Sequence, residues 1–352
     1  MVCLVMPLRC FYLGCVLDTC AMRRCFVVRD ITNNATQQQM RYTWLMEIIT
    51  GLHNIQPRHK GCVLTIGNFD GVHRGHQRLI EHLREQSQRL QVPSMLMTFE
   101  PQPREFFAGA MLPARLTRFR EKVQLLQGTG LDRLLCMPFN EKTAQIPASW
   151  FAEDFMSEQV GAQYVVIGDD FRFGHGREGD LSLLQRAGKK FGYEVNSMNT
   201  VLQGNERISS TLVRSTLANG DFEKATTLLG HEYFIMGRVV YGRQLGRQLG
   251  VPTANVKLQR YRAALEGVYC VTVEGINADG SALTGIANIG VRPTVDGKEP
   301  LLEVHVFDFA GDLYGRRIKV TFKHKLRDEQ AFASVDLLKQ QIDADLVSAR
   351  SW

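Results

Sequence analysis

Short apolar runs alternate with stretches of helical periodicity between Cys62 and about Tyr193. The apolar runs are CVLTIG, SMLMTF, RLLCMPF and YVVIGDDF, and the helix-period stretches that follow them span residues 76–90, 117–127, 148–160 and 180–191. Buried strands that each lead into an amphipathic helix predict βα units and a parallel sheet. We therefore expect a Rossmann-like α/β domain whose ligands bind beyond the carboxyl ends of the strands.

The pattern turns helical after the fourth unit and then changes to a β-rich one. Ser209 or Ser210 can cap a first helix that Gly220 ends, and Asp221 can cap a second helix that Gly230 ends. These two helices are expected to close the first domain. The β-rich runs that follow are YFIMGRVVY, GVYCVTV, ALTGIANIG, LLEVHVFDF and RRIKVTFK. They predict a small antiparallel β-barrel, followed by a terminal helix over residues 327–349.

A chain of 352 residues exceeds the usual size of one hydrophobic core, so we expect two domains. We place the first at residues 46–230 and the second at residues 231–352. The formal net charge is +6, but five arginines against two aspartates in residues 1–45 supply half of it. The remaining chain is too balanced in charge for a nucleic-acid binder.

Residues 1–45 differ in composition from the rest, and five of the eight cysteines lie in the first 25 residues. A secretion signal and an organellar transit peptide are two interpretations, but Arg9 and Asp18 interrupt the apolar run and serine is absent. We favour a third interpretation, in which the segment is a non-native or unstructured leader. Met46 is then the natural start, because patterned sequence begins there.

Two observations bear on where the protein works. No run reaches the roughly 18 apolar residues that a membrane-spanning helix needs. The three later cysteines are scattered in strand-like surroundings without a CxxC pair, which predicts buried thiols in a reducing compartment: Cys62, Cys136 and Cys270. We therefore expect a cytoplasmic protein without a membrane segment.

The most informative string is GNFDGVHRGH, residues 67–76, which lies between the first apolar run and the first helical stretch. Its glycines let the backbone approach an anion closely, and a helix N-terminus offers unpaired N–H groups. His73 and His76 can donate hydrogen bonds to phosphate oxygens that gain charge in a transition state. Helix capping and metal binding are alternative roles, although no further ligand has a recognisable zinc spacing.

This string is similar to the HxGH-type signature of nucleotidylyltransferases, and in full it resembles the adenylyltransferase half of bacterial bifunctional riboflavin kinase/FAD synthetases. Four further strings resemble blocks of that family in the same order: TFEPQPREFF, RLTRFREK, VVIGDDFRFGHGREGD and ISSTLVR. The resemblance implies that His73, His76 and Arg214 assist catalysis. It also implies that ATP or its phosphates are bound by Gly67, Asn68, Phe69, Asp70, Gly75, Asp170, Ser209, Ser210 and Thr211.

The residues of these blocks leave other roles open. Hydroxyl groups at a helix start with an arginine one turn later can hold an anion, which agrees with the implied role of ISSTLVR. Simple capping remains an alternative for Ser209 or Ser210, and stabilisation of a loop remains one for Asp170.

A second constellation is GRVVYGRQLGRQLGVPTAN, residues 237–255. Three glycines recur at every fourth position: Gly242, Gly246 and Gly250. They can keep a loop open to phosphates through backbone N–H groups, as a P-loop does, although GxxxxGK[ST] is absent. Arginines and glutamines between the glycines argue against a membrane helix. The string resembles the flavokinase signature ending in PTAN, which implies that Thr253 and Asn255 bind Mg²⁺ and phosphate; their oxygens suit this cation.

Glu303 lies in the alternating run LLEVHVFDF and shares one strand face with His305 and Phe307. On spacing alone, a carboxylate on an exposed barrel face is unremarkable. In flavokinases the glutamate of this strand takes the proton from the ribityl hydroxyl that attacks ATP. The resemblance therefore implies that Glu303 is the catalytic base.

The resemblance runs from about Met46 to the terminal helix and implies two-step FAD synthesis. ATP with Mg²⁺ phosphorylates riboflavin to FMN, and a second ATP adenylylates FMN to FAD with release of pyrophosphate. The expected partners are these small molecules, with neither nucleic acid nor membrane, in a monomer or weak homo-oligomer. The alternatives are another HxGH-type nucleotidylyltransferase, which would lack the barrel, and a non-catalytic flavin or nucleotide sensor, which would lack the catalytic residues.

Overall fold

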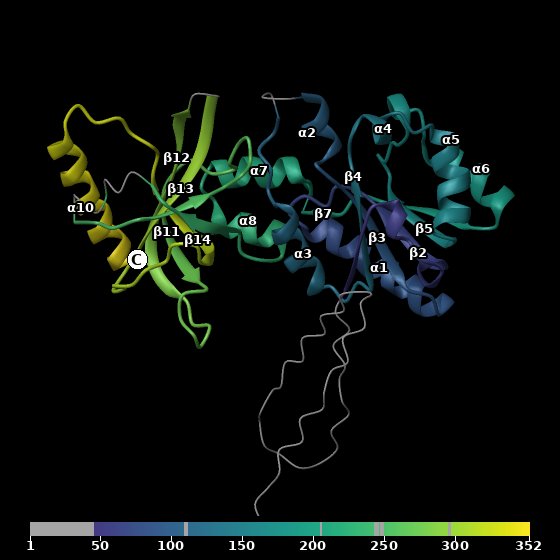
Figure 1. The fold of residues 1–352 in the computed structure, drawn as a ribbon, viewed down its shortest axis with the longest axis horizontal. Coiled ribbons are helices and arrows are strands. Elements are labelled where there is room, and N and C mark those ends of the chain that lie inside the picture. Colours follow the sequence, from purple (N-terminus) through teal and green to yellow (C-terminus); the bar gives the residue numbers. More distant parts are fainter. Residues whose placement is uncertain (1–45, 109–111, 205, 243–245, 247–249, 295–296) are drawn as a thin grey trace, which may run out of the picture. The chain divides into compact units, whose positions relative to one another are not determined.

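A computed structural model describes residues 46–352 except for 109–111, 205, 243–245, 247–249 and 295–296, and except for the side chains of 291–299. The predictions made for residues 1–45 lie outside the described residues. The described chain forms a parallel α/β sheet followed by an antiparallel barrel (Figure 1), which confirms the predicted fold class.

The first part is a six-stranded parallel sheet with the strand order β1-β4-β3-β2-β5-β6. Its strands are β1 (Glu47–Thr50), β2 (Cys62–Ile66), β3 (Ser94–Glu100), β4 (Arg133–Pro138), β5 (Ala162–Gly168) and β6 (Glu194–Met198). The four predicted strands are the central ones, whose side chains are mostly buried, as expected for strands covered on both faces. The sequence pattern misses the two edge strands, because β1 is short and β6 has no buried side chain.

Helices cover both faces of this sheet (Figure 1). One hydrophobic core joins the sheet to α1 (Arg74–Leu90) and α3 (Phe119–Gln127), and another joins it to η4 (Phe151–Gln159) and α6 (Leu181–Phe191). These helices confirm the four predicted helical stretches, although the third is a short α5 (Ala148–Trp150) that continues as the π-helical η4. The remaining short helices are η1 (Leu52–Asn54), η2 (Pro57–His59), α2 (Pro103–Ala108), α4 (Glu141–Ala144) and η5 (His175–Arg177).

Helices α7 (Ser210–Ala218) and α8 (Phe222–Leu229) follow a small ribbon of β7 (Leu202–Gln203) and β8 (Glu206–Arg207). The side chains of Ser209 and Asp221 accept backbone N–H groups from the first turns of α7 and α8, as predicted. Gly230 ends α8 in the left-handed region, also as predicted. The apolar faces of both helices belong to the same hydrophobic core as the barrel strands, so the helix pair packs on the barrel.

The second part is a closed antiparallel barrel with the strand order β10-β13-β12-β11-β14-β9. Its strands are β9 (Phe234–Val240), β10 (Ala254–Lys257), β11 (Gly267–Glu274), β12 (Leu283–Thr294), β13 (Gly297–Val306) and β14 (Arg317–Arg327). The five predicted strands are present, and the sequence pattern misses the four-residue β10.

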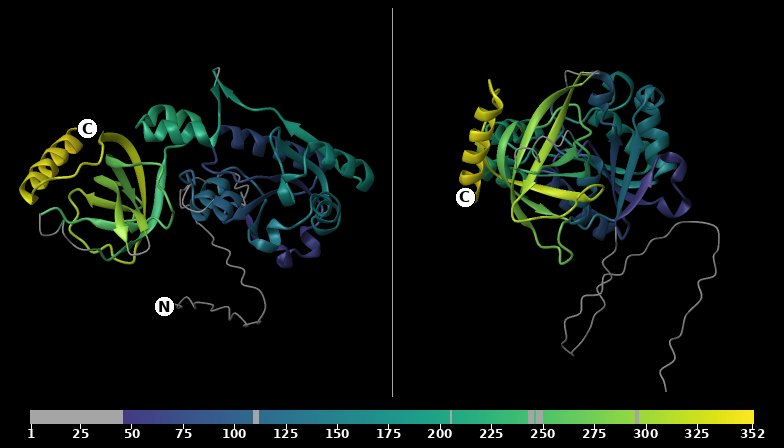
Figure 2. Two further views of the ribbon diagram at one scale, coloured as in Figure 1. Left: turned by 90° about the horizontal axis from the view of Figure 1, so that it is seen from above. Right: turned by 60° about the vertical axis from the view of Figure 1, so that its left-hand side comes forward.

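The terminal helix α10 (Val335–Ser351) begins later than predicted, because β14 extends to Arg327 and Ser334 caps the helix. Figure 2 shows α10 along the outside of the barrel, where Arg327 forms an ion pair with Asp345 at 2.8 Å.

Two findings relate to the predicted location. In the part of the chain that the structure describes, no helix is both long enough and apolar enough to cross a bilayer. Cys62, Cys136 and Cys270 are free and buried, as predicted. Burial raises the pKa of each thiol, to about 11 for Cys136, so these cysteines are poor nucleophiles.

Candidate active sites

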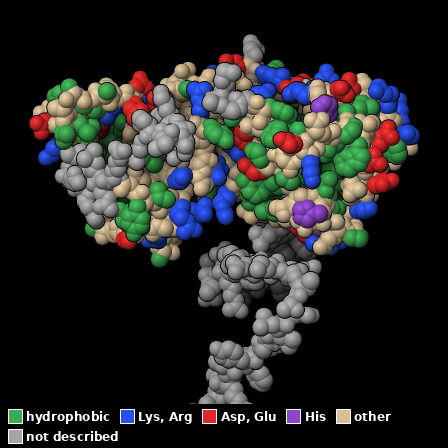
Figure 3. All heavy atoms as spheres, turned by 45° about the horizontal axis from the view of Figure 1, so that its top comes forward, with side chains coloured by type: hydrophobic (Ala, Val, Ile, Leu, Met, Phe, Trp, Pro, Cys, Tyr) green, Lys and Arg blue, Asp and Glu red, His purple; other side chains and the backbone are tan. Residues whose placement is uncertain are grey.

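A cavity of about 850 Å³ lies at the carboxyl ends of β2 to β5, where an α/β sheet places its ligands. Figure 3 shows apolar and charged side chains interspersed on this part of the molecule. The cavity is lined by every residue that the sequence assigns to adenylyl transfer: Gly67, Asn68, Phe69, Asp70, His73, Gly75, His76, Asp170, Ser209, Ser210, Thr211 and Arg214. The fold thus brings together blocks that are more than 100 residues apart in sequence.

The two histidines form a stacked pair at the start of α1, with ring centroids 3.6 Å apart. His73 caps the helix, because its Nδ1 accepts the backbone N–H of His76 at 3.3 Å. This bond leaves the proton of the neutral ring on Nε2, where it can be donated to a ligand. Burial lowers the pKa of His73 to about 4 and that of His76 well below its usual value, so both rings are neutral at physiological pH. His73 therefore both caps α1 and lines the cavity.

Asp70 is a buried anchor within the glycine turn. Its carboxylate accepts the backbone N–H groups of Leu116 at 3.1 Å and Thr117 at 2.9 Å. It also forms an ion pair with Arg214, whose Nη2 lies 2.6 Å from Oδ2. The Nε of Arg214 donates to the carbonyl of Ala114. Asp70 was predicted to bind phosphate, and in the structure its carboxylate fixes the guanidinium of Arg214 beside the cavity.

The backbone of the glycine turn is held in an unusual conformation. Phe69, Gly71 and Val72 have φ angles of +47°, +84° and +43°, and positive φ is rare for a β-branched residue. Such backbone persists only where the surroundings fix it. Lys122 on α3 contributes to this, because its buried Nζ donates to the carbonyl of Asn68 at 2.6 Å. Burial lowers the pKa of Lys122 to about 8.

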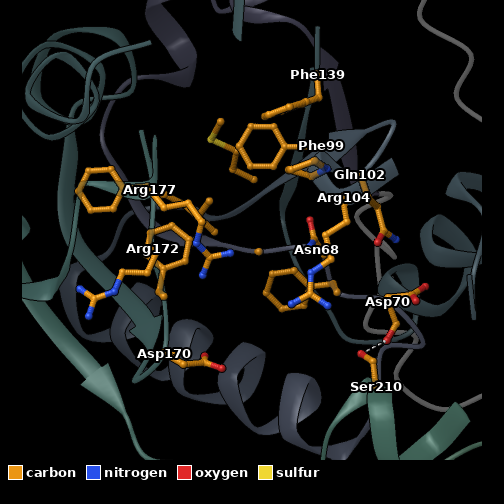
Figure 4. A pocket seen from close by; sticks show the side chains of 18 of the residues that line it. Asn68, Asp70, Phe99, Gln102, Arg104, Phe139, Asp170, Arg172, Arg177 and Ser210 are labelled. Carbon is orange, nitrogen blue, oxygen red and sulfur yellow. Dashed lines mark hydrogen bonds between the residues drawn. The ribbon is translucent and has the colours of Figure 1, made fainter. Parts of the chain in front are cut away.

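The ISSTLVR block divides its polar groups between capping and the cavity. Ser209 Oγ accepts the N–H of Leu212 at 3.2 Å, so this residue caps α7 and also lines the cavity. Ser210 Oγ donates to the carbonyl of Asp70 at 3.0 Å (Figure 4). Thr211 lines the cavity and is exposed.

Asp170 lies in the loop after β5 and forms an ion pair with Arg207 at 2.9 Å. Both side chains are more than half exposed, so Asp170 takes part in a surface contact and also lines the cavity. Arg104 and Arg177 also line the cavity, and Figure 4 shows them on opposite sides of it. These two arginines are not among the predicted site residues, although they stand within the strings TFEPQPREFF and VVIGDDFRFGHGREGD.

One wall of the cavity is aromatic. Phe139 makes edge contacts with Phe99 and Phe107, with ring centroids 5.6 and 5.7 Å apart, and all three line the cavity. Phe107 is 70% exposed, so its ring is accessible from the cavity. The wall offers a surface for a flat apolar ring.

A second group of polar side chains lies on three neighbouring strands of the barrel. The register pairs Glu303 of β13 with Asn255 of β10 on one side and with Asn288 of β12 on the other. Residues paired in this way share one face of a sheet. Their neighbours in sequence point into the barrel core, so this face is the outer one. Asn255 Oδ1 and Asn288 Oδ1 are buried without a hydrogen-bond partner among the described residues.

The predicted glycine loop lies directly against this group. A Cβ atom at Gly242 would collide with the side chain of Asn255, and one at Gly246 would approach Thr253 Oγ1 to 3.2 Å. Gly250 has open space around it and a φ of +84°, so glycine is needed there for backbone conformation. Gly242, Gly246, Thr253, Asn255 and Glu303 thus lie close together, and their role in binding stays a prediction.

Comparisons with known proteins cover both parts of the chain. Residues 55–212 match the family model described as FAD synthetase, and residues 229–352 match the one described as riboflavin kinase. The bifunctional riboflavin kinase/FMN adenylyltransferase of Pseudomonas fluorescens is 51% identical over 308 residues, and that of Escherichia coli (strain K12) is 49% identical over 308. These alignments cover 87% of this chain and 97% and 98% of the relatives. The chain belongs to this family.

A solved structure shares the fold of this bifunctional riboflavin kinase/FMN adenylyltransferase family member. It is the crystal structure of a Streptococcus pneumoniae protein described as a macrolide-efflux protein, with 30% sequence identity and a TM-score of 0.70. The similarity covers 88% of this chain and 99% of that one.

Sequence reasoning misses two polar residues of these sites. Lys122 stands in RLTRFREK, but a lysine in a helix usually indicates a solvated face, and only the packing of α3 against the glycine turn buries it. Asn288 stands in GIANIG, and only the strand register shows that it lies beside Glu303. For Lys122, the resemblance of RLTRFREK to a block of the family was the available signal.

Proposed function

We propose that the two reactions of this bifunctional enzyme are divided between its two parts. Adenylyl transfer to FMN takes place in residues 46–230, and phosphorylation of riboflavin takes place in residues 231–352. The observation that carries this division is the separation of the predicted residues into two groups. One group lines a single cavity at the strand ends, and the other gathers on the outer face of the barrel.

In the barrel, Glu303 accepts the proton of the riboflavin 5′-hydroxyl as its oxygen attacks the γ-phosphorus of ATP, and FMN and ADP result. The glycine loop leaves room for the phosphates beside Thr253 and Asn255. These two residues fit Mg²⁺, because a buried amide oxygen without a partner and a hydroxyl are hard oxygen ligands. Mg²⁺, when bound, neutralises charge on the ATP phosphates.

In the α/β part, a phosphate oxygen of FMN attacks the α-phosphorus of ATP, and pyrophosphate leaves. No covalent enzyme intermediate is needed, so the protein contributes alignment and stabilisation of charge. His73 and His76 donate as neutral imidazoles, and Arg214 supplies a positive charge whose position Asp70 fixes. Arg104 and Arg177 supply further positive charge at the cavity.

The aromatic wall formed by Phe99, Phe107 and Phe139 receives the isoalloxazine ring of FMN. Its rings present apolar faces and edges to the cavity, and a flat aromatic ligand packs well on such a surface. The exposure of Phe107 supports this assignment, because a bound flavin would cover it.

The division is tested by incubating purified protein with riboflavin, ATP and Mg²⁺ and separating the flavins over time. The double variant His73→Asn/His76→Ala is expected to stop at FMN; asparagine retains the helix cap that His73 provides. Glu303→Gln is expected to leave riboflavin unused but still to convert supplied FMN into FAD. Loss of both activities in either variant, while it remains folded, would show that the two reactions do not have separate sites.

Three further assignments belong to the same proposal. The working compartment is the cytoplasm, which the buried free thiols support. The partners are riboflavin, FMN and ATP, without nucleic acid. The enzyme is a monomer or a weak homo-oligomer.

A further inference from the structure

One segment of the α/β part contacts both the cavity residues and the barrel. This segment, residues 114–122, joins the cavity wall to the first turn of α3, and we call it the strap. On its cavity side it supplies the Leu116 and Thr117 N–H groups that bind Asp70. It also supplies the Ala114 carbonyl that accepts from Arg214, and Lys122, which holds the glycine turn.

The opposite side of the strap is bound by the barrel. Arg260, which follows β10, donates from Nη2 to both carboxylate oxygens of Glu121 at 2.9 and 3.1 Å. Its Nη1 donates to the carbonyl of Arg115 at 3.2 Å. Glu121 also accepts the backbone N–H of Met236 on β9 at 2.8 Å, and the Tyr233 hydroxyl donates to the carbonyl of Leu116 at 3.3 Å. Three residues of the barrel part, Arg260, Met236 and Tyr233, thus fix the strap through these five hydrogen bonds.

The ion pair between Arg260 and Glu121 is the most buried one that the described residues contain, with both side chains 1% exposed. A buried pair of this kind often adds little net stability over apolar residues of similar volume, because both charges lose their hydration. What it does provide is directionality, since the two N–H···O bonds fix the carboxylate relative to the guanidinium. The pair therefore fixes the position of the strap more than it adds to the free energy of unfolding.

Helix α7 is a second element that connects the barrel with the cavity. Val213 and Leu217 lie in the hydrophobic core of the barrel, whereas Arg214, between them in sequence, reaches the cavity. Both partners of the Asp70–Arg214 ion pair are thus supported by elements that rest on the barrel.

We propose that Arg260, a residue of the kinase barrel, is a positioning residue for FMN adenylylation. Through Glu121 and the strap it holds Asp70, and with it Arg214, in the geometry that the transition state of adenylyl transfer requires. This inference rests on the proposed location of adenylyl transfer in the α/β cavity. None of the described contacts of Arg260 reaches Glu303, Thr253 or Asn255, so we expect riboflavin phosphorylation not to depend on this residue.

The test compares three substitutions in the full chain, with both activities measured on each sample. Arg260→Lys keeps a positive charge opposite Glu121 but cannot reach all the present acceptors. The double variant Arg260→Met/Glu121→Gln removes both charges, so that no unpaired buried charge remains. Arg262→Met is the matched control, since Arg262 is an exposed arginine two residues away.

We expect kcat for FMN adenylylation to fall about tenfold or more in the double variant and less in Arg260→Lys, with KM for ATP changed less than about threefold. Riboflavin phosphorylation should stay within about twofold of the wild type in all three variants, and Arg262→Met should change neither activity. A general loss of folding would instead lower both activities together.

Three results would overturn the inference: both activities unchanged in the double variant, both lowered to the same extent, or a rise in KM alone. Should the double variant not fold, Arg260→Lys decides alone, because it retains the buried ion pair. The histidine variant distinguishes the two proposals. If His73→Asn/His76→Ala still adenylylates FMN, the proposed site is wrong; if it stalls and Arg260→Lys is indistinguishable from wild type, only the role of Arg260 is wrong.

Discussion

The two proposed active sites of this chain are supported in different ways. In the α/β cavity, functional groups are held by buried charges that are distant in sequence: Asp70 fixes Arg214, which lies 144 residues further on, and Lys122 fixes the carbonyl of Asn68. On the barrel, Asn255, Glu303 and Asn288 are placed side by side by the backbone hydrogen bonds of three strands.

This difference predicts how each site responds to substitution. Removing one partner of a buried ion pair leaves the other charge without compensation, which costs more than the pair contributes. Strand register is set by backbone groups and by the turns, so a side chain on the outer face can change without moving its neighbours. Substitutions of supporting residues should therefore have larger effects in the cavity than on the barrel.

The largest effect is expected at Arg214. Arg214→Met should lower kcat for FMN adenylylation by about 10²–10³-fold, the usual range when one charge-stabilising donor is lost. Riboflavin phosphorylation in the same sample should be unchanged. Arg214→Lys retains the charge but cannot bind both Asp70 and the Ala114 carbonyl, so an intermediate rate is expected. An unchanged kcat in Arg214→Met would contradict this difference between the sites, because the Asp70–Arg214 ion pair would then have no role in adenylyl transfer.

A smaller effect is expected at Asn288 on the barrel. Asn288→Ala should lower kcat for riboflavin phosphorylation about tenfold, because it removes a buried amide oxygen that has no partner among the described residues and is available to a ligand beside Glu303. FMN adenylylation should be unaffected. Asn277→Ala is the matched control, since Asn277 lies in the turn between β11 and β12. A loss as large as that of Arg214→Met would mean that side chains, and not the strand register, support the barrel site.

The same difference explains what the sequence can and cannot predict. The central strands β2 to β5 and the helix caps at Ser209 and Asp221 follow from local patterns, and the structure has them as predicted. The role of Asp70 as an anchor and the burial of Lys122 depend on which segments pack against the glycine turn. No periodicity encodes such contacts. Asn288 is missed for a related reason, because the sequence of neither strand alone determines the register of β12 against β13.

The smallest effect is a loss of stability as the pH decreases, and it follows from the burial of His73. Burial lowers the pKa of His73 from its ordinary value of 6.5 to about 4 in the folded protein. Between these values the unfolded chain binds a proton at this residue and the folded chain does not, so the free energy of unfolding falls as the pH decreases. Between pH 7 and pH 6 this single group accounts for a loss of about 0.7 kcal/mol.

The measurement is urea unfolding at pH 7 and pH 6, followed by the fluorescence of Trp150, which lines the cavity, with Trp44 and Trp352 replaced by Phe. His73→Asn keeps the helix cap and removes the titrating ring, so the variant should lose about 0.7 kcal/mol less than the wild type between the two pH values. All other titrating groups are present in both proteins and cancel in this difference. If His73→Asn instead lost more stability than the wild type between pH 7 and pH 6, His73 would be protonated in the fold. The stacked histidine pair would then be positively charged when it binds phosphate. Burial would not be what sets its protonation state.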